Sequence, residues 1–191
     1  MEIKQKLGKA QAHLYSLWQS LRTGDSLPLK ADITIRDLKY FTPYYSIVHL
    51  NEAGQPAVLR SGTGLDELWG RNISGLTIAD ISPRQTRGHF TSFVEHMLAH
   101  PCGGLSKDTF TAENGDIFVR ELLLLPVQTK NGSTVLAVMA GVKGLGTQGW
   151  GGAISSAARA SKETHRTEFL DVGFGIPALG DKMGVGSASF A

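Results

Sequence analysis

Cysteine is almost absent from the sequence, since only one of its 191 residues, Cys102, carries a thiol. A single cysteine cannot form a disulfide within the chain, and it cannot supply a thiolate zinc site by itself. The chain is therefore not a small domain that depends on disulfides or on a zinc site of cysteine thiolates for its stability. A lone cysteine usually fills space in a core, and we interpret Cys102 as a packing residue.

A surplus of one charge is also lacking, because 19 Lys and Arg residues are matched by 17 Asp and Glu residues, for a net charge of +2. Neither sign is concentrated in one part of the chain. Proteins that bind nucleic acid or anionic lipid normally carry a concentrated basic face. We therefore predict no nucleic-acid partner.

Long apolar runs are missing too. The longest, residues 135–142, contains Gly141 and is far shorter than the roughly 20 residues that a membrane-spanning helix needs. The first six residues have no apolar stretch of the signal-peptide type. These absences predict a cytoplasmic protein that does not insert into a membrane.

Recognisable catalytic arrangements are absent as well. The sequence shows no Ser-His-Asp order, no phosphate-binding Walker loop and no convincing pair of catalytic carboxylates. The adjacent carboxylates of Asp66 and Glu67 are better explained as solvated residues of a short helix. We predict that the protein is not an enzyme, and we predict no cofactor, although an unknown small ligand stays open.

Glycine, by contrast, is abundant, and its distribution divides the chain. Of the 23 glycines, 10 fall in the last 49 residues, which are also rich in Ala and Ser. So few bulky side chains cannot build a second core. We predict an N-terminal helix and linker over 1–27, one domain over 28–143, and a flexible tail over 144–191. Residues 167–177 are the apolar cluster of that tail and the part suited to docking.

Apolar residues recur at intervals of four and three over residues 3–21, which predicts an amphipathic helix. Gly24 and Pro28 are typical of the end of such a helix. Two alternatives remain: the helix packs on its own domain, or it forms a self-association or partner surface. The second hypothesis uses Leu7, Leu14, Leu17, Trp18 and Leu21.

The domain itself alternates between strand and helix signals. β-branched and aromatic residues predict strands over 44–50 and 57–61. Short helices are expected at 65–69, which ends at Gly70, and at 76–81, and a longer helix is expected to open at Ser82-Pro83 and run to about Ala99.

Three further strands are expected over 104–112, 117–127 and 134–142. The pairs Asn114-Gly115 and Asn131-Gly132 between them are typical of tight hairpin turns, which join strands antiparallel. The whole order predicts an α+β domain with one five-stranded antiparallel sheet, flanked by short helices and one longer helix.

This order of elements resembles a PAS domain, and in particular the short bacterial PAS proteins without a fused effector domain. The resemblance covers about residues 14–142 and rests on short motifs in a fixed order. They are residues 17–24 (LWQSLRTG), the segment from Pro28 to Asp32, residues 62–65 (GTGL), residues 65–75 (LDELWGRNISG) and residues 120–126 (RELLLLP).

The resemblance implies a regulator in bacterial signal transduction, of the two-component kind, that acts by binding a signalling partner such as a histidine kinase, and it allows a homodimer. The alternative is a small-ligand sensor with a pocket between the sheet and the helices. Candidate pocket residues are Trp69, Phe90, Phe93, Met97, Leu123 and Met139, although apolar residues at these periods are more often plain core.

Two patterns point to cofactors only weakly. His89, His96 and His100 fall on one side of the longer helix, about 100° from its apolar face, which favours a solvated stripe over a metal site. Some PAS sensors bind haem through a histidine on the equivalent helix, so His96 is the weak haem candidate. Residues 144–149 satisfy G-x-G-x-x-G, but they follow an antiparallel meander, so dinucleotide binding is only a remote alternative.

Overall fold

The computed structural model of the chain describes residues 3–82, 84–111, 117–144 and 164–178. Within these residues the strands are β1 (Tyr45–Leu50), β2 (Pro56–Ser61), β3 (Gly103–Thr111), β4 (Ile117–Gln128), β5 (Thr134–Gly144) and β6 (Thr164–Leu170). The α-helices are α1 (Lys9–Leu21), α2 (Ile35–Leu38), α3 (Thr63–Trp69), α4 (Ile78–Ile81) and α5 (Arg87–Ala99). Short 3₁₀ helices complete the set: η1 (Ile3–Lys6), η2 (Lys30–Asp32) and η3 (Lys39–Tyr44).

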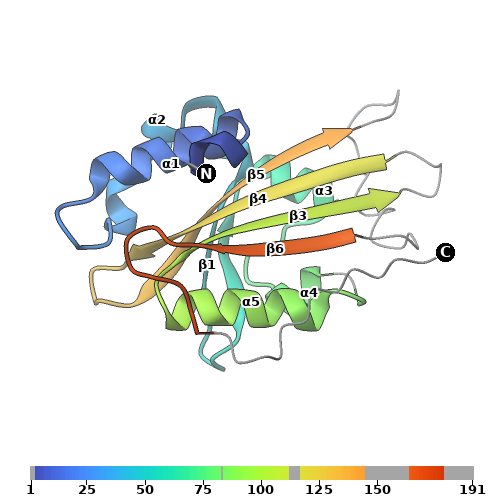
Figure 1. Cartoon of the computed structure of the whole chain (residues 1–191). Helices are drawn as coiled ribbons and strands as arrows, with labels where there is room; N and C mark the ends of the chain where they lie inside the picture. The colour runs from blue at the N-terminus through green and yellow to red at the C-terminus, as the bar shows by residue number, and fades with distance from the viewer. Residues whose placement is uncertain (1–2, 83, 112–116, 145–163, 179–191) are drawn as a thin grey trace.

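All the strands lie in one sheet with the order β2-β1-β5-β4-β3-β6, and every neighbouring pair is antiparallel (Figure 1). The predicted α+β class and the meander of β3, β4 and β5 are therefore confirmed, and the two strands predicted over 44–50 and 57–61 pair with each other as β1 and β2. No helix among the described residues is long and apolar enough to span a membrane.

The sheet has six strands rather than the five that we expected, because β6 extends it beyond β3. β6 lies in the segment predicted to be a flexible tail. It escapes a sequence-based prediction because only Phe169 and Leu170 of its seven residues are apolar, too few for an alternating pattern. Pairing with β3 satisfies the main-chain groups that an edge strand would otherwise expose. The rest of that predicted tail, residues 145–163 and 179–191, lies outside the described residues.

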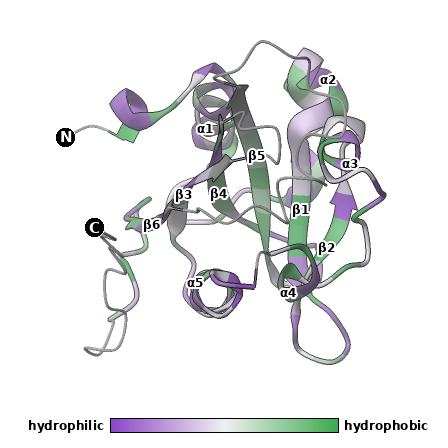
Figure 2. Ribbon diagram, turned by 90° about the vertical axis from the view of Figure 1, so that its right-hand side faces the viewer, coloured by the Kyte–Doolittle hydropathy of each residue, from purple (hydrophilic) through white to green (hydrophobic). Residues whose placement is uncertain are grey.

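Helices cover both faces of the sheet and create two separate cores (Figure 2). The α5-side core joins α3, α4 and α5 to one face, and it includes Leu65, Leu68, Ile78, Phe90, Phe93, Val94, Met97, Cys102, Leu122 and Leu124. The α1-side core joins α1 and α2 to the other face, and it includes Leu14, Tyr15, Trp18, Leu38, Leu123, Leu125, Val135, Met139, Leu170 and Val172. Cys102 is thus the packing residue that we expected. Burial, with a smaller contribution from the negative charge of Asp171, raises the pKa of its thiol to about 12.

The N-terminal helix packs on its own domain. Leu14 and Trp18 are fully buried in the α1-side core, and the Trp18 indole nitrogen donates a hydrogen bond to the carbonyl of Pro126 over 2.7 Å. Leu7, Leu17 and Leu21 also pack against this core. Leu14 and Trp18 of the stripe are therefore enclosed by their own domain, as the first of the two alternatives predicts.

Two helix boundaries differ from expectation. The helix predicted over 3–21 is divided, because Gly8 adopts an extended backbone at the N-cap of α1 and separates it from η1. The helix predicted to open at Ser82 begins at Arg87 instead. Ser82 is extended, with φ −95° and ψ 141°, as the residue before a proline tends to be, and it stands at the C-cap of α4, while Thr86 occupies the N-cap of α5.

We predict that Leu14→Ala lowers the free energy of unfolding by about 2–5 kcal/mol, the usual cost of emptying a fully buried leucine site. Leu17→Ala, on the same helix but partly exposed, should cost clearly less. Urea denaturation of both variants measures the difference. Equal costs would contradict the packing of α1 described above.

Candidate ligand pocket

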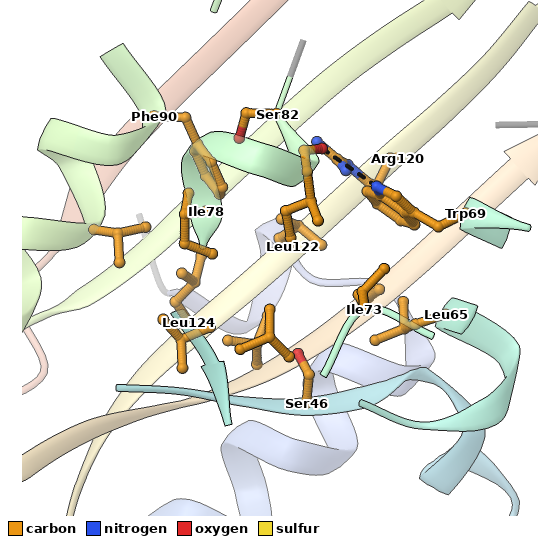
Figure 3. Close-up of a pocket in the computed structure, with 16 residues that line it drawn as sticks. Ser46, Leu65, Trp69, Ile73, Ile78, Ser82, Phe90, Arg120, Leu122 and Leu124 are labelled. Carbon is orange, nitrogen blue, oxygen red and sulfur yellow. Dashed lines mark hydrogen bonds between the residues drawn. The ribbon is translucent and has the colours of Figure 1, made fainter. Parts of the chain in front are cut away.

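A small, partly open pocket lies between the sheet and the helices α3, α4 and α5 (Figure 3). Its volume is about 50 Å³. Most of its lining is apolar, from Val48, Val58, Leu65, Trp69, Ile73, Ile78, Ile81, Phe90, Val94, Leu122, Leu124, Val138 and Ala140. The polar lining residues are Ser46, Ser82 and Arg120. The cavity is therefore a gap in the α5-side core with a polar rim.

The polar side is organised around a buried ion pair. Arg120 on β4 lies opposite Asp108 on β3, and its Nε donates to the Asp108 carboxylate over 2.8 Å, with a second bond from Nη2. Both side chains are more than nine-tenths buried. The Trp69 ring lies 5.1 Å from the guanidinium carbon, and its indole nitrogen donates to the Ile81 carbonyl over 3.2 Å. The charge that faces the cavity is thus already balanced within the protein.

Local turn chemistry holds α3 and α4 over the cavity. α3 ends at Gly70, whose φ of +63° suits glycine, as its position in the sequence predicted. Asp66 on α3 accepts hydrogen bonds from the Ser61 hydroxyl (2.6 Å) and from the Ile73 amide (3.1 Å), which brings Ile73 to the lining.

A capping box opens α4, and it fixes the carboxylate of Asp80. Asp80 accepts bonds from the Thr77 hydroxyl (2.7 Å) and amide (3.1 Å), and in return its own amide donates to the Thr77 hydroxyl. The hydroxyl bond, reinforced by the amide bond, lowers the pKa of Asp80. The capping box therefore fixes the start of this short helix, next to Ile78 in the cavity lining.

Only part of the candidate pocket set comes together. Trp69 and Phe90 line the cavity, while Phe93 and Met97 are buried in the same core without lining it. Leu123 and Met139 lie on the opposite face, in the α1-side core, so their assignment to the pocket was wrong.

Strand alternation explains the error. Side chains of successive strand residues point to opposite faces of a sheet. On β4 the residues that line the cavity are Arg120, Leu122 and Leu124, all of the same parity, while Leu123 has the other. On β5 the lining residues are Val138 and Ala140, and Met139 again has the wrong parity. If the facing of one residue on each strand is known, this alternation identifies the lining residues.

The histidine stripe faces protein rather than solvent or a metal. His89 Nε2 lies 2.7 Å from the hydroxyl of Thr167, and His96 Nδ1 donates to the Ser92 carbonyl over 2.6 Å. His100 Nε2 donates to the Phe174 carbonyl over 3.0 Å. None of the three lines the cavity, so the geometry does not bring the weak haem candidate His96 to it. Over the described residues, no cluster of three or more His, Cys, Asp or Glu side chains could hold a metal ion.

The glycine-rich signature over 144–149 cannot be placed. Its first residue, Gly144, ends β5, and residues 145–149 lie outside the described residues. β5 pairs antiparallel with both of its neighbours, whereas a dinucleotide-binding fold requires the signature after a strand of a parallel sheet.

Comparison with known protein families gives a match over most of the chain. A family model described as PAS domain matches residues 7–140. The match includes α1 and the cavity-lining residues, and it ends within β5, before β6. No curated protein matches the sequence.

We predict that removing one partner of the buried ion pair destabilises the fold. Asp108→Leu or Arg120→Met alone should lower the free energy of unfolding by about 3–5 kcal/mol, because an uncompensated charge is left buried. The double variant should cost clearly less than the sum of the two. Urea titrations of all three variants give the coupling, and additive costs would contradict a direct Asp108–Arg120 interaction.

Proposed function

This chain belongs to the PAS domain family, and from that membership we propose that it is a non-enzymatic regulator that passes its signal by binding another signalling protein. A signal-sensing or regulatory role follows from the family itself. The proposal adds the mode of action and the surface that carries it. Its support is a group of large side chains left exposed beside α1.

The supporting observation is the α2–η3 patch, which we define as Ile35, Arg36, Lys39 and Tyr40. Ile35 is 68% exposed and Tyr40 is 76% exposed, the two largest exposures among the large hydrophobic side chains described. Tyrosine and arginine are enriched at the energetic centres of protein interfaces. The patch lies within the residues that match the family, on the same side of the sheet as α1.

The backbone presents this patch in an unusual way. Lys39 has φ +54° and ψ −133°, and among the described residues it is the one non-glycine residue with positive φ. Such a conformation costs free energy, on the order of 1–3 kcal/mol, and strain of this kind tends to occur at functional sites. Here it lies at the junction of α2 and η3, immediately before Tyr40.

The charge of the patch specifies the kind of partner. Over residues 30–40, Lys30, Arg36 and Lys39 outnumber Asp32 and Asp37. The Asp37 carboxylate accepts bonds from the hydroxyl and amide of Thr34 in the capping box that opens α2, and these bonds lower its pKa, so it stays ionised and the segment keeps a small positive excess. We therefore expect a partner surface that is acidic and offers apolar contacts, and a signalling kinase is the class that the family relationship favours.

Site-specific photo-crosslinking in the native host tests the proposal. A photoreactive phenylalanine in place of Tyr40 should capture a signalling protein that mass spectrometry identifies. The same group in place of Glu95, an exposed residue of α5 on the opposite side of the sheet, should not capture it. Capture of nothing at residue 40, or equal capture at both positions, would contradict the proposal.

Alanine variants then measure the contribution of the patch. We predict that Tyr40→Ala and Ile35→Ala each weaken binding to the captured partner about tenfold or more, as truncation of an interface centre does. Their unfolding free energies should change by less than about 0.5 kcal/mol, since both side chains are exposed. Ile176→Ala is the matched control, because Ile176 is a half-exposed apolar residue elsewhere on the chain. This variant should bind the captured partner with the affinity of the wild type. Unchanged affinity in the two patch variants would place the contact elsewhere.

A second candidate, a small-ligand sensor, is favoured by the apolar cavity beside Arg120. Typical ligand pockets measure roughly 300–1,000 Å³. The cavity here, about 50 Å³, accepts only a group of a few heavy atoms unless α3, α4 and α5 move apart.

Native mass spectrometry of the protein purified from its own host distinguishes the two functions. A ligand sensor should retain a bound small molecule, and replacing Ala140 in the lining by Leu should then displace it. We predict a mass equal to that of the polypeptide alone. A retained molecule that Ala140→Leu removes would support the sensor instead.

A further inference from the structure

The segment over residues 164–178, which we call the strap, contacts both helical layers of the molecule. It consists of β6 and the residues that follow (Figure 1, red). In Figure 1 it leaves β6, turns beside the end of α1 and runs back to the end of α5. It lies beyond the residues that match the family, so its contacts are additions to the matched domain.

On the α5 side, contacts near the start, the middle and the end of the helix hold the strap. The hydroxyl of Thr167 is hydrogen-bonded to His89 near the start of α5. The Phe174 carbonyl accepts a hydrogen bond from His100, which directly follows the end of α5. Between them the Phe169 ring lies 4.7 Å from the ring of Phe93. The whole length of α5 is therefore in contact with the strap.

On the α1 side, one arginine makes the central contact. Arg22, directly after α1, donates from Nη1 to the Val172 carbonyl over 2.7 Å. Its guanidinium carbon lies 4.9 Å from the Phe174 ring and 5.2 Å from the Trp18 ring, so it is stacked between them. Leu170 and Val172 are buried in the α1-side core, like Trp18.

The shape of the strap is fixed by its own turn. The Asp171 carboxylate accepts bonds from the amides of Gly173 (2.8 Å) and Gly175 (3.0 Å). Both glycines have positive φ, +103° and +76°, which a residue with a side chain rarely adopts. The turn sends the chain from the α1-side core back to α5, so both sets of contacts depend on one ordered segment.

We infer that the strap couples the two helical layers, so that loosening its contact with α5 also loosens α1. Two series of packed groups that both end on the strap support this coupling. One runs from Phe90 in the cavity lining through Phe93 to Phe169, and the other runs from Phe174 through Arg22 to Trp18. The inference concerns communication within the chain, and it holds whether or not the α2–η3 patch binds a partner.

Hydrogen exchange of the full chain tests the coupling. Phe169→Ala removes a ring that packs on the α5-side core. We predict faster amide exchange in β6 and α5, and also in residues 14–21 of α1, by about fivefold or more, the lower range of measured couplings between sites. Leu65→Ala, a truncation in the same core but on α3, is the matched control and should leave the α1 rates unchanged.

The reverse experiment starts from α1, because coupling between two sites is reciprocal. Arg22→Ala should speed exchange at residues 96–100, at the end of α5, while Lys9→Ala, an exposed residue of the same helix, should not. If Phe169→Ala does not fold, Phe169→Leu takes its place. The inference is overturned if the α1 rates in the Phe169 variant equal those in Leu65→Ala, or if Arg22→Ala leaves residues 96–100 unchanged.

Discussion

The burial of β4 on both of its faces is the constraint on which the rest of the structure depends. Leu122 and Leu124 belong to the α5-side core, and Leu123 and Leu125 belong to the α1-side core. A strand with no solvent face needs helices on both sides, and it needs strands on both edges to satisfy its main chain. β5 and β3 provide those edges. The two helical layers are therefore connected through β4, because each layer packs against one of its faces.

The same strand explains why the cavity is small and polar at one side. Arg120 has the parity of Leu122 and Leu124, so it must point into the α5-side core. A buried guanidinium requires an acceptor, and Asp108 on β3 supplies it directly opposite. The Trp69 ring then covers the guanidinium, and the remaining space is the cavity. The site is thus a consequence of placing one charge in an otherwise apolar strand face.

Most of the fold could be predicted from local sequence, whereas the site and the strap could not. Gly70, Gly132 and the apolar stripe of α1 determine structure through residues close to them in sequence, so the two turns and the helix over Lys9–Leu21 could be predicted, although not the break at Gly8. The face to which Leu123 and Met139 point depends on the pairing register of their strands. Because apolar residues occupy both faces of these strands, the hydrophobic pattern does not determine which alternate residues face α5. β6 depends on an edge more than fifty residues earlier in the sequence, and no local pattern carries that information.

The central claim is that two helical layers, on opposite faces of one sheet, are joined through β4 and again through β6 and the segment that follows it. Nuclear Overhauser contacts in the isotope-labelled full chain test it most directly. The account predicts contacts from the Phe169 ring to Phe93 and from the Phe174 ring to Arg22 in one sample. Absence of both, with random-coil shifts over residues 164–170, would contradict it.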